Sequence, residues 1–550
     1  MSLVPGCSAD LMSGRNLRKR PESFCSARLR SIQKVIRWPM DFTVEEFFAV
    51  AGQFQLGGLD TESQHPLTLH LSEQAQQDLP AALAALKAVD VLALERFVEK
   101  AAGLPALAEA IQRTLRDGKR LFFCGCGATG RLSLSLEWFC RCGLLPAGME
   151  DRVISFMAGG DMALIKAIEK FEDHPEYGAR QLEELGFAEG DLLLATTEGG
   201  ETPWVIGATE RAAELSTNPP WFLYCNPDEE LIAAAERSRR VLANEKIRKL
   251  NLAVGPMALA GSTRMQASTV LMAALGFAVQ HREQPASAWS EARRFLERVR
   301  DMDLSWLAPF TAAEAKIYQD GGYVLYDPAV FGITVLTDTT ERSPTFMLRP
   351  FENQLKSDEP ASWCHLYMPE IADGQSAWTA ILKRAPRTLE WDGVREIAGA
   401  EALAGYDFSA TLLEKRLART GGAPVHLFVI RKTPTGLSFS LDDLHHTMEM
   451  PGASFVTQNL LLKLILNTHS TLVMGRLGRY LDNLMTYVKP SNLKLIDRAI
   501  RYVRLLMQRR NGTCPDYATV ARQLFLEQAR LGSEEPIVMK TMLALAAKGG

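Results

Sequence analysis

A glycine-rich turn stands where the chain passes from a predicted strand into a predicted helix. Residues 124–133 read CGCGATGRLS, after the apolar run RLFFC and before the helical stretch LSLSLEWFC. Glycines at positions 125, 127 and 130 let backbone N–H groups approach a ligand closely, and the positive end of the following helix attracts negative charge. The spacing favours an anion site, for the phosphate of a small ligand.

Two other interpretations of this turn stay open. Gly125, Gly127 and Gly130 formally satisfy the dinucleotide pattern G-x-G-x-x-G. That pattern places an acidic residue at the end of a second strand about 20 residues further on. Asp151 and Asp161 come later and in another context. The G-x-x-x-x-G-K-[ST] pattern does not fit, and a plain strand–helix connection also needs glycine.

A second turn combines glycine with hydroxyl and carboxyl groups. Residues 196–202, TTEGGET, follow the predicted strand DLLLA. Ligands of parallel α/β sheets bind outside the carboxyl ends of the strands. We therefore expect the turns at 125–130 and 196–202 to converge on one crevice.

Alternating strands and helices must position these turns. Apolar residues recur at helical spacing over 72–116, and repeated pairs of an apolar strand and a helix follow, which predicts a parallel, doubly wound sheet. The strands of this first series are RLFFCG, RVISFMAG, DLLLATT, PWFLYCN and KLNLAVG, and helices are expected after each, including one from Ala163 and one near Ser262. A charged helical stretch over 288–320 then leads to a second series, with strands GGYVLYD, SWCHLYMPE, RTLEWDG and PVHLFVIRK. From Phe455 onward the pattern is helical throughout.

The chain's composition is that of a globular protein with several structural units. It has 550 residues, of which 47% are hydrophobic and 23% charged, and a net charge of −4, which leaves no basic face for nucleic acid. Its nine cysteines form no CxxC pair, which favours buried thiols in a reducing cytosol over a metal site. No apolar run is long enough to span a membrane. The basic first forty residues are expected to be a disordered arm.

Four stretches resemble the sugar-isomerase-domain family that contains N-acetylmuramic acid 6-phosphate etherase and the glucokinase regulatory protein. They are GCGATGRLS (125–133), AGGD with EKFED (158–173), GPMALAGSTRMQAST (255–269) and LNTHSTLVMGRLGRYLDNLMTYVKPSNLKL (466–495). An upstream stretch, LDTESQHPLT (59–68), is similar to the family's T-E-x-x-N-P-x-T segment, with His65 in place of the Asn.

The order of these motifs implies an architecture. In the etherases GSTRM and the following LNTHST segment are contiguous, whereas here the second α/β series separates them. This resembles the regulatory branch, with an internal pseudo-dimer. We expect an α/β fold of two doubly wound parallel-sheet sugar isomerase (SIS) domains with an all-helical C-terminal lid. The expected boundaries are 1–45 for the arm, 46–300 and 301–455 for the two SIS domains, and 456–550 for the lid.

The resemblance implies two catalytic carboxylates. The family's D-A-S-E-C-P-P-T motif is matched by DTTERSPTF (338–346), which places Glu341 at the acid/base position, whereas the first domain has Trp138 and Phe139 at that place. Glu172, in EKFED, matches a second Glu that contacts the sugar. Two carboxylates near a sugar suit ring opening and proton abstraction beside a carbonyl. As alternatives, Glu341 is a helix-end surface charge and Glu172 part of a solvated helix face.

The remaining site residues implied by the resemblance would hold the phosphate and the sugar. They are Gly127, Ala128 and Thr129 in the first turn, Thr197, Glu198 and Gly199 in the second, Ser262 and Thr263 in GSTRM, and Lys494 in SNLKL. Ala128 and Glu198 depart from the family's hydroxyl-rich turns, which puts phosphate affinity in question. Ser262 and Thr263 would otherwise cap a helix, and Lys494 would otherwise be an exposed lysine.

These motifs imply a cytoplasmic protein that senses a hexose phosphate and regulates a partner such as a sugar kinase. The alternative is a lyase that releases D-lactate from N-acetylmuramic acid 6-phosphate, and an aldose–ketose isomerase is a weaker one. No cofactor, metal, nucleic acid or membrane is expected to take part.

Overall fold

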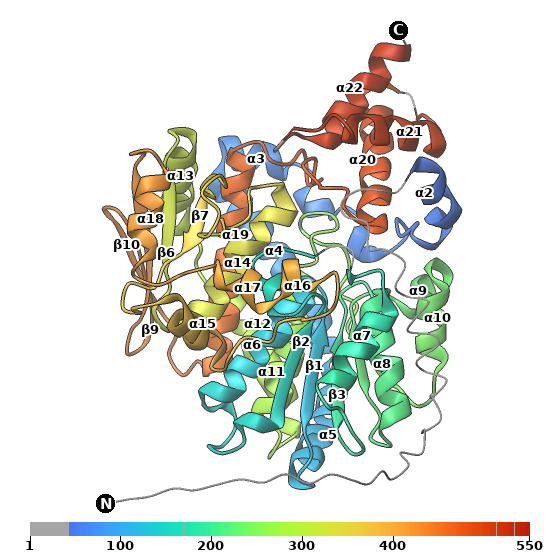
Figure 1. Cartoon of the computed structure of the whole chain (residues 1–550), viewed down its shortest axis with the longest axis vertical. Coiled ribbons are helices and arrows are strands. Elements are labelled where there is room, and N and C mark those ends of the chain that lie inside the picture. Colours follow the sequence, from blue (N-terminus) through green and yellow to red (C-terminus); the bar gives the residue numbers. More distant parts are fainter. Residues whose placement is uncertain (1–42, 169–170, 513, 533, 550) are drawn as a thin grey trace, which may run out of the picture. The chain divides into compact units, whose positions relative to one another are not determined.

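Two five-stranded sheets form the framework that positions the two turns (Figure 1). The computed structural model describes residues 43–168, 171–512, 514–532 and 534–549. The prediction of a disordered arm therefore falls almost entirely outside the described residues. Residues from Phe42 onward belong to one compact unit, so both sheets lie in the same body.

The first sheet is wholly parallel, in the order β2-β1-β3-β4-β5. Its strands are β1 (Leu121–Gly125), β2 (Val153–Met157), β3 (Leu192–Thr196), β4 (Trp221–Tyr224) and β5 (Arg248–Asn251). Leu121 pairs with Val153 on one side and with Leu192 on the other, so β1 is central and buried throughout. A strand buried on both faces must be a continuous apolar run, as LFFCG is.

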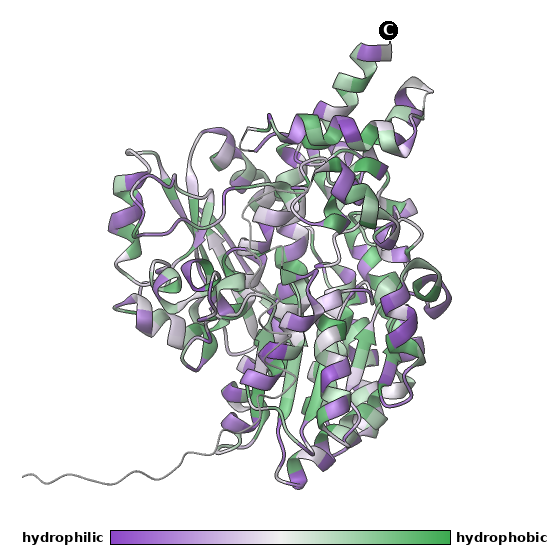
Figure 2. Cartoon of the chain, turned by 45° about the vertical axis from the view of Figure 1, so that its right-hand side comes forward, coloured by the Kyte–Doolittle hydropathy of each residue, from purple (hydrophilic) through white to green (hydrophobic). Residues whose placement is uncertain are grey.

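Helices cover both faces of this sheet. On one face α5 (Leu104–Arg116), α6 (Ala128–Phe139) and α11 (Gln266–Gln280) pack together, and on the other α7 (Pro175–Glu184) packs on α8 (Pro203–Leu215). Figure 2 shows the strands as hydrophobic and the outer sides of the helices as hydrophilic. The expected helical region before β1 is confirmed, as α3 (Leu71–Gln77), α4 (Leu79–Lys100) and α5.

The second sheet is mixed, in the order β10-β9-β8-β6-β7. The strands β6 (Tyr323–Asp327), β7 (Cys364–Leu366) and β8 (Val425–Lys432) are parallel, as expected. An antiparallel hairpin of β9 (Gly436–Leu441) and β10 (Leu444–Glu449) extends the sheet beyond β8. This half also contains short helices: α15 (Gly374–Leu382), α16 (Arg395–Ala398), α17 (Ala400–Ala404) and α18 (Leu412–Arg419).

A long buried helix, α19 (Phe455–Arg476), joins the two halves. It packs against α11 of the first half and against α13 (Leu307–Gln319) and α14 (Gly332–Phe346) of the second. The connecting helix α12 (Ala286–Asp301) packs on α4. Beyond α19, the helices α20 (Leu493–Asn511), α21 (Tyr517–Gln528) and α22 (Ile537–Gly549) pack on one another, next to the N-terminal helix α2 (Val44–Val50), which contacts α21.

Three sequence-based element predictions are wrong. No long helix starts at Ala163 within the described residues 161–168, where the 3₁₀ turn η7 (Asp161–Leu164) forms, and α7 begins at Pro175. The segment RTLEWDG is not a strand, because its backbone instead bonds Asp161 of the first half through the Arg387 carbonyl. The C-terminal region is not helical throughout: after α19, Gly478 takes a φ of +68°, and residues 477–492 form the irregular link to α20.

Among the described residues, no helix combines the length and apolar character needed to cross a bilayer.

Candidate functional site

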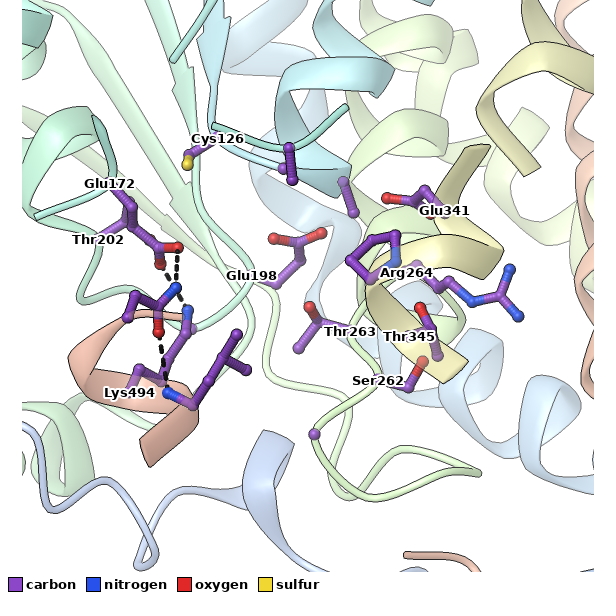
Figure 3. A pocket seen from close by; sticks show the side chains of 18 of the residues that line it. Cys126, Glu172, Glu198, Thr202, Ser262, Thr263, Arg264, Glu341, Thr345 and Lys494 are labelled. Carbon is purple, nitrogen blue, oxygen red and sulfur yellow. Dashed lines mark hydrogen bonds and ion pairs between the residues drawn. The ribbon is translucent and has the colours of Figure 1, made fainter. Parts of the chain in front are cut away.

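The carboxyl ends of β1 and β3 open into a cavity of about 180 Å³ that is lined by both halves of the chain and by α20 (Figure 3). Nine of the predicted site residues line it. These are Gly127, Ala128, Glu172, Glu198, Gly199, Ser262, Thr263, Glu341 and Lys494. The two glycine-containing turns therefore do converge on one crevice, as the parallel sheet requires.

The glycines of the first turn are required by close packing. A Cβ on Gly125 would come within 2.3 Å of the Thr129 backbone, and one on Gly130 within 2.6 Å of the Met157 side chain. Gly127, which precedes the first residue of α6, has a φ of +55°, a conformation that favours glycine. The turn thus brings the N-terminus of α6 to the edge of the cavity, where the positive end of the helix suits an anion.

The hydroxyl groups of the two predicted threonines, Thr129 and Thr197, form hydrogen bonds within their own turns. The Thr129 hydroxyl donates to the Cys126 carbonyl and accepts from the Cys126 N–H, both at 2.9 Å. The Thr197 hydroxyl lies 3.0 Å from that of Thr202 and accepts from the Gly200 N–H. Neither is among the described residues that line the cavity. These hydroxyls help to fix their turns, and the prediction that Thr129 and Thr197 contact the ligand stays a prediction.

Glu341 reaches the cavity from the second half of the chain. It lies on α14, is largely buried, and has its carboxylate 3.9 Å from the guanidinium of Arg131 on α6. Burial raises the pKa of the Glu341 carboxyl above its ordinary value, and the positive charges of Arg131 and Arg264 partly oppose this rise. The surface-charge alternative for Glu341 does not fit this burial.

Glu172 and Lys494 form an ion pair with each other. The Lys494 ammonium donates to the Glu172 carboxylate at 2.6 Å and lies 3.4 Å from Glu201, while Asn492 donates to Glu172 at 3.3 Å. Although burial opposes it, attraction from Glu172 and Glu201 holds the pKa of Lys494 well above its ordinary value. The lysine is thus neither exposed nor free to act alone on a phosphate.

Glu198 points into the middle of the cavity from the second turn (Figure 3). The Ser268 hydroxyl of α11 donates to its carboxylate at 2.6 Å. Burial raises the pKa of Glu198 to about 7, which the Ser268 hydrogen bond opposes and the negative charge of Glu341 reinforces.

Ser262 and Thr263 precede α11 without capping it. The helix begins at Gln266, and its N-cap position is Met265, so the predicted helix start near Ser262 is wrong by a turn. Gly261, with a φ of +72°, donates its N–H to the Thr61 carbonyl and holds the loop against the cavity. The Ser262 hydroxyl is buried there and has no hydrogen-bond partner among the described residues, which leaves it available to a ligand.

Five charged residues of the cavity were not predicted from the sequence: Glu62, Arg131, Glu201, Arg264 and Arg498. Arg131 and Arg264 lie inside the quoted motifs GATGR and GSTRM, so their place in those motifs was a usable signal. Arg264 forms a buried ion pair with Asp338 at 3.1 Å. Glu62, in LDTES, forms one with Arg498 at 2.6 Å, and this pair carried no local signal because its partners come from opposite ends of the chain.

The described residues contain no group of three or more His, Cys, Asp or Glu side chains arranged to hold a metal ion. The cavity brings the carboxyl groups of Glu198 and Glu341, which can take part in acid–base chemistry, next to the N-terminus of α6.

Comparison with known proteins places this cavity in a family. A family model described as the glucokinase regulatory protein N-terminal SIS domain matches residues 106–213. The N-acetylmuramic acid 6-phosphate etherase of Yersinia pestis (strain Pestoides F) is 35% identical over 220 residues, which cover 39% of this chain and 67% of the etherase. The etherase of Yersinia pseudotuberculosis serotype I (strain IP32953) gives the same values.

Solved structures that this chain matches have lower sequence identity. The C-terminal domain of glucosamine-fructose-6-phosphate aminotransferase from Francisella tularensis is 10% identical, with a TM-score of 0.36, covering 70% of this chain and 95% of that one. A phosphoheptose isomerase from Neisseria gonorrhoeae is 17% identical, with a TM-score of 0.26, covering 36% of this chain and 95% of that one.

Proposed function

The chain belongs to the sugar isomerase domain family, in the branch of the N-acetylmuramic acid 6-phosphate etherases and the glucokinase regulatory protein, and we propose that it is a lyase that removes lactate from N-acetylmuramic acid 6-phosphate. One observation carries this proposal. Glu341, which matches the etherase acid/base motif, lies in the same cavity as the glycine turn although it belongs to the other half of the chain.

The cavity supplies groups for both ends of such a substrate. The backbone N–H groups at Gly127 and Ala128 suit the phosphate, because the N-terminus of α6 favours an anion. The unpartnered Ser262 hydroxyl is a further donor at the cavity wall. Glu172, held by Lys494 and Asn492, has its carboxylate fixed for hydrogen bonds to sugar hydroxyls.

The proposed reaction needs a base that removes a proton from the carbon next to a carbonyl group. In the open-chain aldehyde form, a carboxylate removes the proton from C2, and the electron pair forms the C2=C3 double bond as the C3–O bond of the lactyl ether breaks. The leaving oxygen takes a proton from an acid, and lactate departs. Addition of water at C3 then completes net hydrolysis. Glu341 would act as one of these acid–base groups, and burial raises the pKa of its carboxyl group above the ordinary value.

The test is direct. Purified full-length protein is incubated with N-acetylmuramic acid 6-phosphate, and D-lactate is assayed enzymatically, with unphosphorylated N-acetylmuramic acid as the matched control. We expect lactate from the phosphorylated substrate and far less from the control. Binding of the phosphosugar without any lactate release contradicts the proposal.

A second candidate function is sensing of a hexose phosphate with regulation of a sugar kinase. The match of residues 106–213 to the regulatory protein's N-terminal domain supports it, as do two sheets in one chain. The same assay separates the two functions, since a sensor binds the phosphosugar and changes a kinase's activity while releasing no lactate. An aldose–ketose isomerase would give a ketose phosphate instead. We keep the boundaries 46–300, 301–455 and 456–550 as the proposed division of either protein.

A further inference from the structure

The strand β10 forms one edge of the second sheet, and among the described residues it pairs with β9 alone (Figure 1). Its six residues, Leu444–Glu449, oppose the six of β9 in a continuous register without a bulge. The side chains alternate along the strand between half-buried and exposed. The exposed ones are those of His445, Thr447 and Glu449. β10 therefore presents a straight, open edge to another strand.

The hydrogen bonds of the hairpin show which backbone groups of β10 point outward. In an antiparallel pair every second residue bonds the partner strand, and the residues between them direct their N–H and C=O groups to the other side. In the register of this hairpin, the Met450 N–H donates to the Thr435 carbonyl at 2.8 Å, so the even-numbered residues of β10 are the ones that bond β9. The outward-facing residues are His445, Thr447 and Glu449.

The other edge strands of the two sheets are short or capped. β7 has three residues and β5 has four. On β2, the Ser155 N–H donates to Glu137 at 3.2 Å and the Ser155 carbonyl accepts from Arg387 at 2.8 Å. β10 has no proline, no lysine and no bulge, which are the features with which edge strands commonly avoid pairing.

A second copy of β10 fits this edge in one antiparallel register. Hydrogen bonds form only where outward-facing residues of the two copies meet. A two-fold axis at Thr447 pairs this residue with its own copy and pairs His445 with Glu449 of the second copy. An axis one residue nearer the turn places Asp443 opposite Glu449, two like charges, and an axis one residue further on places Pro451, which has no N–H, opposite His445.

The side chains of the outward-facing residues also match in the register centred on Thr447. The His445 imidazole of each copy meets the Glu449 carboxylate of the other, and an imidazole N–H can donate to a carboxylate and attracts it when protonated. At the axis, Thr447 faces Thr447, a pair of the kind that stabilises antiparallel strands. This complementarity favours a second copy of the chain as the occupant of the edge.

We infer that the chain forms a two-fold dimer in which β10 pairs antiparallel with β10 of a second copy and joins the two second sheets into one. The inference is independent of the proposed function, because none of the six residues of β10 lines the cavity.

Sedimentation equilibrium of the full-length protein tests the dimer. At protein concentrations up to about 100 μM we expect a mass that approaches twice the 60.9 kDa of one chain. Thr447→Pro should be monomeric, because proline removes an N–H from the centre of the new pair and leaves the hydrogen bonds to β9 in place. Thr447→Val, which keeps this N–H, is the matched control and should dimerise like wild type.

Reversal of the charged pair tests the register. His445→Glu places carboxylates opposite each other on both sides of the axis and should raise the Kd of the dimer about three- to tenfold. Addition of Glu449→Lys to this variant should bring the Kd back to within about threefold of wild type, because opposite charges then face each other again. Both positions are exposed, so these variants should fold even if Thr447→Pro does not.

Each outcome supports or overturns the dimer. A wild type that stays monomeric at about 100 μM overturns it and leaves the edge for a strand of another protein. A folded Thr447→Pro variant that dimerises like wild type overturns it as well, because the interface then lies elsewhere. A dimer weakened by His445→Glu but not recovered by the added Glu449→Lys overturns the register.

Discussion

At the scale of single residues, Glu341 is the residue on which the site depends most. It is buried, it comes from the second half of the chain, and it faces Arg131 of the first half. Replacing it by glutamine keeps the shape of the side chain and removes the exchangeable proton. We predict that Glu341→Gln lowers the rate of lactate release about 10²–10⁴-fold and leaves the Kd for the phosphosugar within a few fold.

Isothermal titration with the phosphosugar and a lactate assay check this prediction together. Glu370→Gln, at an exposed position of the same half, is the control and should match wild type in both measurements. A Glu341→Gln variant with full turnover would show that this carboxyl group takes no part in proton transfer.

Glu198 gives the site a predicted pH dependence. Its pKa is raised to about 7 by burial and by Glu341, against the Ser268 hydrogen bond. We predict that the proposed lyase reaction uses Glu198 in its protonated form, so kcat/KM should fall about tenfold per pH unit above pH 7. A pH profile of wild type and of Glu198→Gln checks this, because the variant should lose that fall. A wild-type profile level up to pH 9 contradicts it.

The sequence allowed only part of this site to be predicted. Glycine turns and motif carboxylates carry their own signals, and Gly127, Glu198 and Glu341, which these signals indicate, line the cavity, where their roles stay predictions. What a hydroxyl bonds to is decided by local geometry, and the Thr129 hydroxyl closes its own turn. Which charges pair is decided by the tertiary fold, so the Glu172–Lys494 pair, formed between distant parts of the chain, was not foreseeable.

At the scale of elements, a buried ion cluster fixes α20 to the segment that precedes α3. Glu62 binds Arg498 at 2.6 Å and Arg501 at 2.8 Å, and Glu62 and Arg498 are both buried. Removing the carboxylate leaves two guanidinium groups without their partner. We predict that Glu62→Gln lowers the free energy of unfolding by about 3–5 kcal/mol, the usual cost of breaking a buried pair from one side.

Chemical denaturation at pH 7 measures this change, with the exposed Glu109→Gln as control. The contribution of Glu62 to the free energy of unfolding also depends on pH. Burial opposes ionisation, but Arg498 and Arg501 lower the pKa of Glu62 from 4.5 to about 2. Its stabilisation is therefore complete above about pH 4.5 and is lost as the pH falls toward 2. Equal stability of Glu62→Gln and wild type at pH 7 would contradict the role of this cluster.

Elements with strong periodicity were predictable, and elements defined by tertiary contacts were not. The apolar strands β1, β3 and β6 stand where the sequence places them because buried strands need continuous apolar runs. RTLEWDG has a strand-like composition, yet Trp391 and Leu389 are buried in an irregular segment whose Arg387 bonds the first half. The conformation of such a segment depends on the surface of the first half on which it packs, and the sequence of the segment alone does not specify this conformation.

At the scale of the whole described unit, buried charges couple the two halves. Arg384 donates to Glu137 at 3.0 Å and binds Asp161, and Arg387 donates to Glu137 at 2.8 Å. Attraction from both arginines lowers the pKa of Glu137 to about 2, against the effect of burial. With α19 packed against helices of both sheets, these contacts make separate unfolding of one half costly.

This coupling leads to a prediction about ligand binding. The cavity takes its lining from the first half, from α14 of the second half and from α20, so a ligand binds only when all three are assembled. A phosphosugar at one hundred times its Kd should stabilise the folded state by about 2.7 kcal/mol through mass action. Because the site is shared, we expect the melting of both halves to move to higher temperature together.

Differential scanning calorimetry with N-acetylmuramic acid 6-phosphate, and with its unphosphorylated form as control, measures this shift. Glu341→Gln should still respond, since it keeps the cavity and loses only a proton. Two melting transitions of which the ligand moves only one would mean that one half binds the sugar alone. The contact between Glu341 and Arg131 would then connect the two halves without forming part of a shared binding site.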